Sequence, residues 1–122
     1  MRQRHYRLRK TDKTKIVFFP IFCNYEVRII FTHNLEKSFK RFKHTRDVEP
    51  RAGVDAVTIH VKNEDISYIF FLYKKSDTGT MAHEAYHVIE QLLELHDVGT
   101  HGEVAAYHLG YLVNQIVDLA LQ

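Results

Sequence analysis

The pattern of apolar and polar positions predicts two strands and a helix in the first part of the chain. Residues Ile16–Phe19 and Tyr25–Thr32 are rich in β-branched and aromatic side chains, which favour strands. Residues Leu35–Lys43 place apolar side chains at helical spacing with Lys and Arg between them, which predicts a short amphipathic helix. A polar connection with Pro and Gly follows over His44–Gly53.

A β-hairpin is predicted next. Residues Val54–Val61 alternate, with Val57, Ile59 and Val61 on one face and Ala56, Thr58 and His60 on the other. After a turn, residues Ile66–Tyr73 form an almost continuous apolar run, which predicts a strand buried on both faces.

The second half of the chain predicts two helices. Apolar residues recur at helical spacing after the candidate N-caps Asp77, Thr78 and Thr80, and Gly99 lies in a turn before the final helix. The expected fold is therefore α+β: a small mixed or antiparallel sheet packed by a short N-terminal helix, followed by two helices. We expect a basic arm over residues 1–15 and one domain over residues 16–122.

Composition predicts a protein of the cytoplasm. The apolar fraction is 45%, which is ordinary for a soluble domain, and no stretch approaches the length of a membrane span. The single cysteine, Cys23, excludes an internal disulfide and fits a reducing compartment. We expect Cys23 to be a small core residue rather than a nucleophile, because no basic cluster is evident beside it.

Charge is distributed unevenly along the chain. Residues 1–46 hold 13 Lys and Arg but three Asp and Glu, whereas residues 47–122 hold four and 12. A basic half can attract nucleic acid or an acidic protein. No nucleic-acid module is recognisable around it, so we expect a solvated basic face and a terminal arm instead.

The five residues from His83 to His87 carry the most specific chemistry. Residues four apart on a helix lie about 40° apart around its axis, so both imidazoles can bind one metal ion. Glu84 stands where a carboxylate can reach a water held by that metal. We expect this helix to bury an apolar side that includes Tyr86 and Leu92 and to leave His83, Glu84, His87, Glu90 and Glu94 on the opposite side.

A catalytic zinc ion needs a third protein ligand, and Glu103 is the leading candidate. It begins the final helix, which the preceding turn can fold back against the first. Thr100 and Glu103 also match a capping box, in which Glu103 would bind its own helix terminus instead. The other candidate ligands are His96, Asp97, His101 and His108.

Tyr107 follows Glu103 by four residues and shares its helix face. A tyrosine at this position could donate a hydrogen bond to the oxyanion that forms during amide hydrolysis, and His101 could do the same from the turn. The alternative role for Tyr107 is packing.

The segments Met81–His87 and Gly102–Tyr107 together resemble the active-site core of gluzincins. The closer likeness is to very small bacterial and phage-encoded zinc metallopeptidases, including the ImmA/IrrE type. The resemblance implies a minimal zincin-like domain, His83, His87 and Glu103 as zinc ligands, Glu84 as general base, and a peptide or protein as substrate. The competing hypothesis is a non-enzymatic interaction module that binds nucleic acid or an acidic protein, with a structural metal or none.

Overall fold

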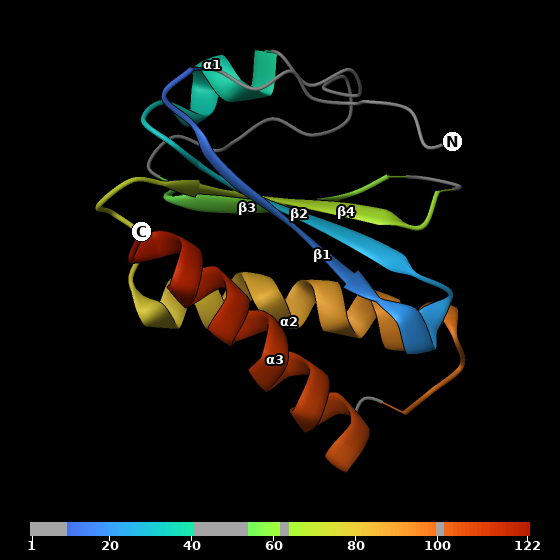
Figure 1. Cartoon of the computed structure of the whole chain (residues 1–122). Helices are drawn as coiled ribbons and strands as arrows, with labels where there is room; N and C mark the ends of the chain where they lie inside the picture. The colour runs from blue at the N-terminus through green and yellow to red at the C-terminus, as the bar shows by residue number, and fades with distance from the viewer. Residues whose placement is uncertain (1–9, 41–53, 62–63, 100–101) are drawn as a thin grey trace.

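The structure is a computed structural model that describes residues 10–40, 54–61, 64–99 and 102–122. Four strands form one mixed sheet in the order β1-β2-β4-β3 (Figure 1). The strands are β1 (Lys13–Phe19), β2 (Tyr25–Thr32), β3 (Ala56–His60) and β4 (Ile66–Leu72). The two outer pairs are antiparallel, and β2 and β4 pair in parallel at the centre.

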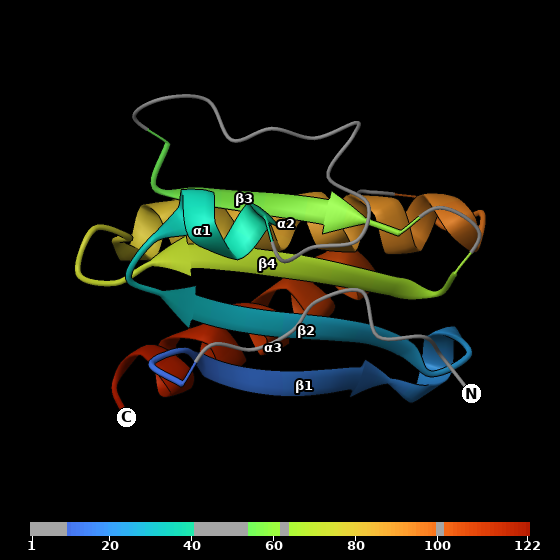
Figure 2. The same cartoon turned by 90° about the horizontal axis from the view of Figure 1, so that it is seen from above.

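The helices lie on the two faces of this sheet. Helix α2 (Thr78–Leu95) and helix α3 (Glu103–Ala120) cover one face, and the short helix α1 (Leu35–Lys40) lies on the other. Seen from above, α2 runs behind β3 and β4 while α3 runs behind β1 and β2 (Figure 2). A single 3-10 turn, η1 (Pro20–Phe22), connects β1 to β2.

The central strands are buried on both faces, as a sheet covered by helices requires. Almost every residue of β2 and β4 is buried. Alternate residues of β4 enter different cores: Phe71 packs beneath α2 and α3, whereas Phe70 packs toward α1 with Leu35. The continuous apolar run of β4 is explained by these two separate cores.

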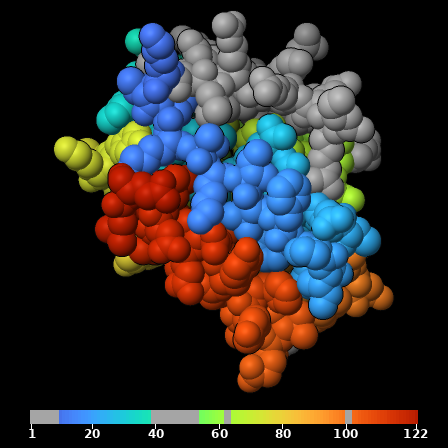
Figure 3. Space-filling model, viewed as in Figure 1, coloured from blue at the N-terminus to red at the C-terminus, as the bar shows by residue number. Residues whose placement is uncertain are grey.

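Helix α3 closes the first core against the other edge of the sheet. Leu112, Ile116 and Leu119 are its buried residues, and Tyr111 meets Phe19 of β1 edge to face, with ring centroids 5.7 Å apart. Figure 3 shows α3 lying directly against β1 on this face of the molecule. The part of the sheet beneath α3 is thus covered by packed side chains. On the other side β3 is the edge strand of the described sheet, and it lies beside α2.

The predicted α+β class is confirmed, and so are the β-hairpin and the two faces assigned to its first strand. The strand at Tyr25–Thr32 has the predicted bounds, while β1 begins at Lys13, inside the predicted arm. The predicted arm residues 1–9 and the connection over residues 44–53 lie outside the described residues.

The prediction that Cys23 is a core residue is wrong. Cys23 is exposed and has a positive φ of 55° at the end of η1. The apolar run around it ends in this turn, where the backbone reverses and the neighbouring Phe22 takes the buried position. Within the described residues, no helix is long and apolar enough to cross a membrane.

The core beneath α2 predicts a large difference between two leucines of that helix. Leu92 is fully buried and Leu95 is 53% exposed. Leu92→Ala should lower the free energy of unfolding by about 2–5 kcal/mol, because it removes buried methyl groups and leaves a cavity. Leu95→Ala should change it by about 0.5 kcal/mol or less. Urea unfolding followed by circular dichroism measures both, and equal losses would contradict the packing described for α2.

Candidate metal centre

The N-cap of α2 fixes where this helix begins and therefore where its histidines lie. The Asp77 carboxylate accepts a hydrogen bond from the backbone N–H of Thr80 at 2.8 Å, which satisfies one of the unpaired donors of the first turn. Of the three candidate N-caps, Asp77 is therefore the one used. His83 lies in the second turn after this cap, and His87 lies one turn further.

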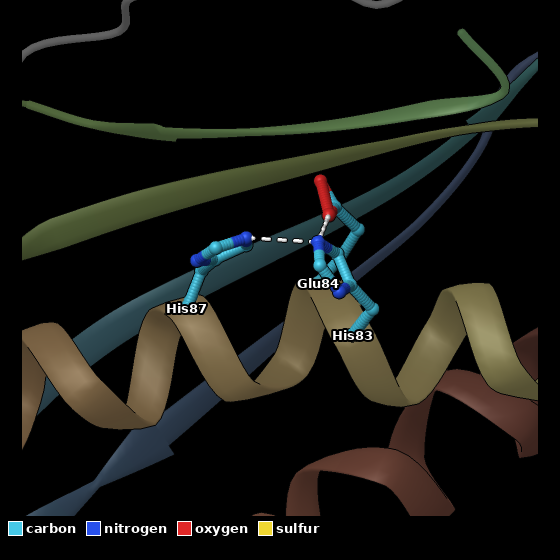
Figure 4. A group of neighbouring side chains, drawn as sticks. All are labelled: His83, Glu84 and His87. Atoms are coloured by element: carbon cyan, nitrogen blue, oxygen red, sulfur yellow. Dashed lines mark hydrogen bonds and ion pairs between the residues drawn. The ribbon is translucent and has the colours of Figure 1, made fainter.

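The two motif histidines converge at one point. Their Nε2 atoms are 3.1 Å apart, with the rings nearly perpendicular (Figure 4). The Nε2 atom of His83 lies 3.8 Å from Oε2 of Glu84. Among the described residues, His83, Glu84 and His87 form a group whose ligand atoms all lie within 4.8 Å of one another.

Glu84 is buried against β3, so the prediction that it lies on a polar side opposite the buried stripe of α2 is wrong. Its residue surface is 7% exposed, while that of Tyr86, expected on the apolar side, is 44% exposed. Glu84 faces strand β3, where the hydroxyl of Thr58 donates to its Oε1 at 3.2 Å. The buried stripe of α2 is therefore rotated toward Glu84, because β3 covers that side of the helix.

Strand β3 supplies two polar residues that sequence reasoning did not include in the site. Ala56, Thr58 and His60 share the face of β3 that meets α2, and Thr58 is the contact to Glu84. The alternating pattern of the sequence predicted that Thr58 and His60 share one face of this strand. The pattern did not predict which face α2 covers.

His60 is held by a hydrogen bond to a buried hydroxyl. Its Nδ1 atom lies 2.8 Å from Oγ of Ser67, which lies 2.6 Å from the hydroxyl of Tyr25. Burial lowers the pKa of His60 from its ordinary value of 6.5, the neighbouring His87 lowers it further, and Glu90 acts in the opposite direction. His60 is exposed at the end of β3, and its lowered pKa favours the neutral ring more than in a free histidine.

A hollow opens beside this group. It has a volume of about 550 Å³ and lies between the first turns of α2 and the start of β3. His83 and Glu84 form part of its wall, as does the N-cap residue Asp77. An extended molecule lying in this hollow would reach the Glu84 carboxylate from the open side.

Glu103 lies close to α2 but outside the group of three. The chain does fold back, since Gly102 lines an apolar pocket of about 260 Å³ together with Tyr86 and Glu90. Glu103 itself is exposed as the first residue of α3. The capping-box prediction is wrong, because the N-cap of α3 is Gly102 and no side chain caps this terminus.

The other candidates have separate environments. Tyr107 is 78% exposed on α3, and its ring lies 6.5 Å from that of His108. His96 and His108 each place Nδ1 2.8 Å from a carbonyl oxygen of their own helix, and both rings pack on Phe22. Asp97 has a positive φ in the turn after α2, and His101 lies outside the described residues.

The geometry of the group fits a zinc ion. Two nitrogen ligands at tetrahedral zinc are separated by about 3.3 Å when each bond is about 2.0 Å. The Nε2 atoms of His83 and His87 are 3.1 Å apart, so both can ligate one ion with little movement. The nitrogen donors and the adjacent buried carboxylate are also the donor types that zinc accepts. Without a metal, one imidazole can donate to the other.

Comparison with known proteins gives no match. No protein-family model, no curated protein and no solved structure matches this chain. The resemblance to gluzincins therefore rests on the motif residues alone.

The N-cap of α2 predicts an acid-dependent contribution to stability. The hydrogen bond from the Thr80 backbone lowers the pKa of Asp77 from its ordinary value of 3.8. A carboxyl whose pKa is lowered by folding stabilises the protein above its unfolded pKa, and this contribution disappears as the pH falls through the folded pKa. Asp77→Asn keeps a capping oxygen but cannot titrate, so its deficit relative to the wild type should shrink in acid.

Urea unfolding between about pH 7 and pH 3 measures this difference. The same substitution at the exposed Asp118, near the end of α3, controls for the loss of one negative charge. A deficit for Asp77→Asn that grew as the pH fell would contradict the capping role of the ionised carboxylate.

Proposed function

We propose that this protein is a zinc-dependent hydrolase that cleaves peptide bonds. The observation that supports this most directly is the convergence of the His83 and His87 Nε2 atoms beside the buried carboxylate of Glu84. Buried carboxylates are uncommon unless they are paired or bind a ligand. Here the carboxylate accepts from one neutral hydroxyl, and its other oxygen lies toward the imidazole pair.

His83 and His87 hold the metal in this proposal, and Glu103 remains the predicted third ligand. Glu103 requires a movement of its side chain or of the start of α3 to join the group, and its exposed position leaves it free to do so. A zinc ion at this position supplies Lewis acidity, which lowers the pKa of a coordinated water toward neutrality and polarises a carbonyl group.

Glu84 is the general base. Its carboxylate accepts a proton from the attacking water as the carbonyl carbon gains a C–O bond, and it returns that proton to the amide nitrogen as the C–N bond breaks. The hydrogen bond from Thr58 holds one carboxylate oxygen at β3, so the other is directed toward the histidine pair. The products are a carboxylic acid and an amine.

The shape of the surroundings favours an extended peptide as substrate. Strand β3 is an edge strand of the sheet, and the hollow beside His83 begins where β3 begins. An extended chain can add to such an edge through backbone hydrogen bonds.

We also propose a cytoplasmic setting in a bacterial or phage-infected cell.

Zinc content tests the proposed centre. Protein purified without added metal should hold about one zinc per chain, because two histidines and a third ligand bind zinc tightly. His83→Ala should abolish binding, while His108→Ala should keep it because His108 lies outside the group. Atomic emission analysis of all three proteins gives the answer. A wild type without zinc that bound nucleic acid in a salt-dependent manner would favour the interaction module instead.

The role of Glu103 is measured in the same assay. If Glu103 is the third ligand, Glu103→Ala should still bind zinc but about 10–100-fold more weakly or worse, as competition with a chelating dye measures. Glu94→Ala, on the exposed side of α2, controls for loss of a carboxylate. Unchanged affinity in Glu103→Ala would remove Glu103 from the ligand set.

Glu84→Gln separates catalysis from metal binding. The amide keeps the size of the side chain but cannot accept the proton, so zinc should remain while peptide cleavage falls by about 10²–10⁴-fold. The assay is mass spectrometry of a degenerate library of end-capped peptides, followed by kinetics on a sequence that the wild type cleaves. A Glu84→Gln protein that cleaved at the wild-type rate would exclude Glu84 as the base.

A further inference from the structure

A chain of three hydrogen-bonded side chains crosses the sheet beneath α2. It begins at Tyr25 on β2, passes through Ser67 on β4 and ends at His60 on β3. Tyr25 is 1% exposed and Ser67 is fully buried, so the chain runs from the interior to the edge strand. A buried polar network of this kind costs free energy unless each member is hydrogen bonded.

The direction of the hydrogen bonds follows from acidity and basicity. The phenol of Tyr25 is a better donor than the alcohol of Ser67, and an imidazole nitrogen is the best acceptor of the three groups. The distances fit either direction, and this order favours Tyr25 as the donor to Ser67 and Ser67 as the donor to Nδ1 of His60. A neutral His60 that accepts at Nδ1 carries its proton on Nε2.

His60 lies on the face of β3 that meets α2, next to the candidate centre. His60 follows Thr58 by two residues, so both side chains leave the same face of β3, and Thr58 contacts Glu84. The start of β3 lies beside the first turns of α2 and Thr58 lies beside Glu84, so His60 lies beside the part of α2 that follows Glu84. Its nitrogens do not belong to the group formed by His83, Glu84 and His87.

That placement suits contact with the substrate better than contact with a metal. A third metal ligand must lie within bonding distance of the same ion as the Nε2 atoms of His83 and His87. A residue that donates a hydrogen bond to the substrate lies further from that ion, because the substrate carbonyl stands between them. A ring nitrogen that carries a proton also has no lone pair for a metal.

We infer that His60 is a further catalytic residue, whose Nε2–H donates a hydrogen bond to the substrate carbonyl oxygen as that oxygen gains negative charge. The inference rests on the proposed hydrolase function. The water supplies the new C–O bond, Glu84 moves the proton to the leaving nitrogen, and His60 retains its own proton throughout. The Ser67–Tyr25 pair fixes the ring and its tautomer before the substrate arrives, so little reorganisation is needed during the reaction.

The tautomer is tested first, on the metal-free protein. Long-range ¹H–¹⁵N correlation spectra should show His60 protonated at Nε2 in the wild type. In Ser67→Ala, which removes the donor to Nδ1, the two tautomers should mix. A wild-type His60 protonated at Nδ1 would overturn the inference without bearing on the zinc site.

Kinetics and zinc content test the role itself. His60→Ala should keep about one zinc per chain and lose about 10²–10³-fold in kcat, as removal of one oxyanion donor does elsewhere. His60→Gln, whose amide can donate, should recover part of that loss. His33→Ala, which changes a histidine stacked on Tyr73 away from α2, should behave as the wild type.

The outcomes separate this inference from the proposed function. Loss of zinc in His60→Ala would make His60 a ligand and overturn the donor role, and so would an unchanged kcat. A wild type that held no zinc or cleaved no peptide in the library would defeat the proposed hydrolase, and the role of His60 with it.

Discussion

The contact between Glu84 and Thr58 determines how the rest of the candidate site is arranged. Together with the buried apolar residues of α2 it sets the rotation of that helix against β3, because a carboxylate is buried favourably only where a donor meets it. With Glu84 turned to the strand, the helical repeat places His83 and His87 at the margin between the helix and solvent. Burial of a carboxylate costs several kcal/mol unless it is compensated, so an apolar residue here would pack at lower cost. A departure of this kind from the best packing is characteristic of functional sites.

The sheet gives that contact a rigid support. Strand β4 is buried on both faces and holds β3 in register through five residue pairs, from Ala56–Phe71 to His60–Ser67. The same strand that positions Thr58 thus also positions His60, and no described strand pairs with its outer edge. Residues of rigid elements hold a catalytic geometry more closely than residues of loops. A site formed by β3 and α2 therefore needs little ordering before a ligand binds.

Periodicity predicted the elements well because each has a pattern of its own: the unbroken apolar run of β4, the alternation of β3 and the helical spacing of α2. It did not predict which elements would meet. Glu84 was assigned to the side of α2 opposite the buried stripe and is instead buried, because β3 covers it. Cys23 was assigned to the core and is instead exposed, because it lies in a turn. The motif alone predicted that His83 and His87 meet, because residues four apart on a helix lie on the same face. Glu103 depends on a connection between helices, which local patterns do not specify.

In this fold the sheet lies beside the helix that carries the reactive groups. In this chain α2 supplies the imidazole pair and the carboxylate, and β3 lies beside it with Thr58 in contact with Glu84 and His60 two residues further along. The hydrogen bonds that connect His60 through Ser67 to Tyr25 hold the imidazole ring in one orientation. An imidazole at an exposed edge would rotate freely, and anchoring it to a buried hydroxyl removes that freedom before binding. If the proposed function holds, the buried hydroxyls of Tyr25 and Ser67 serve to orient His60 at the edge of the sheet, where the substrate is proposed to lie.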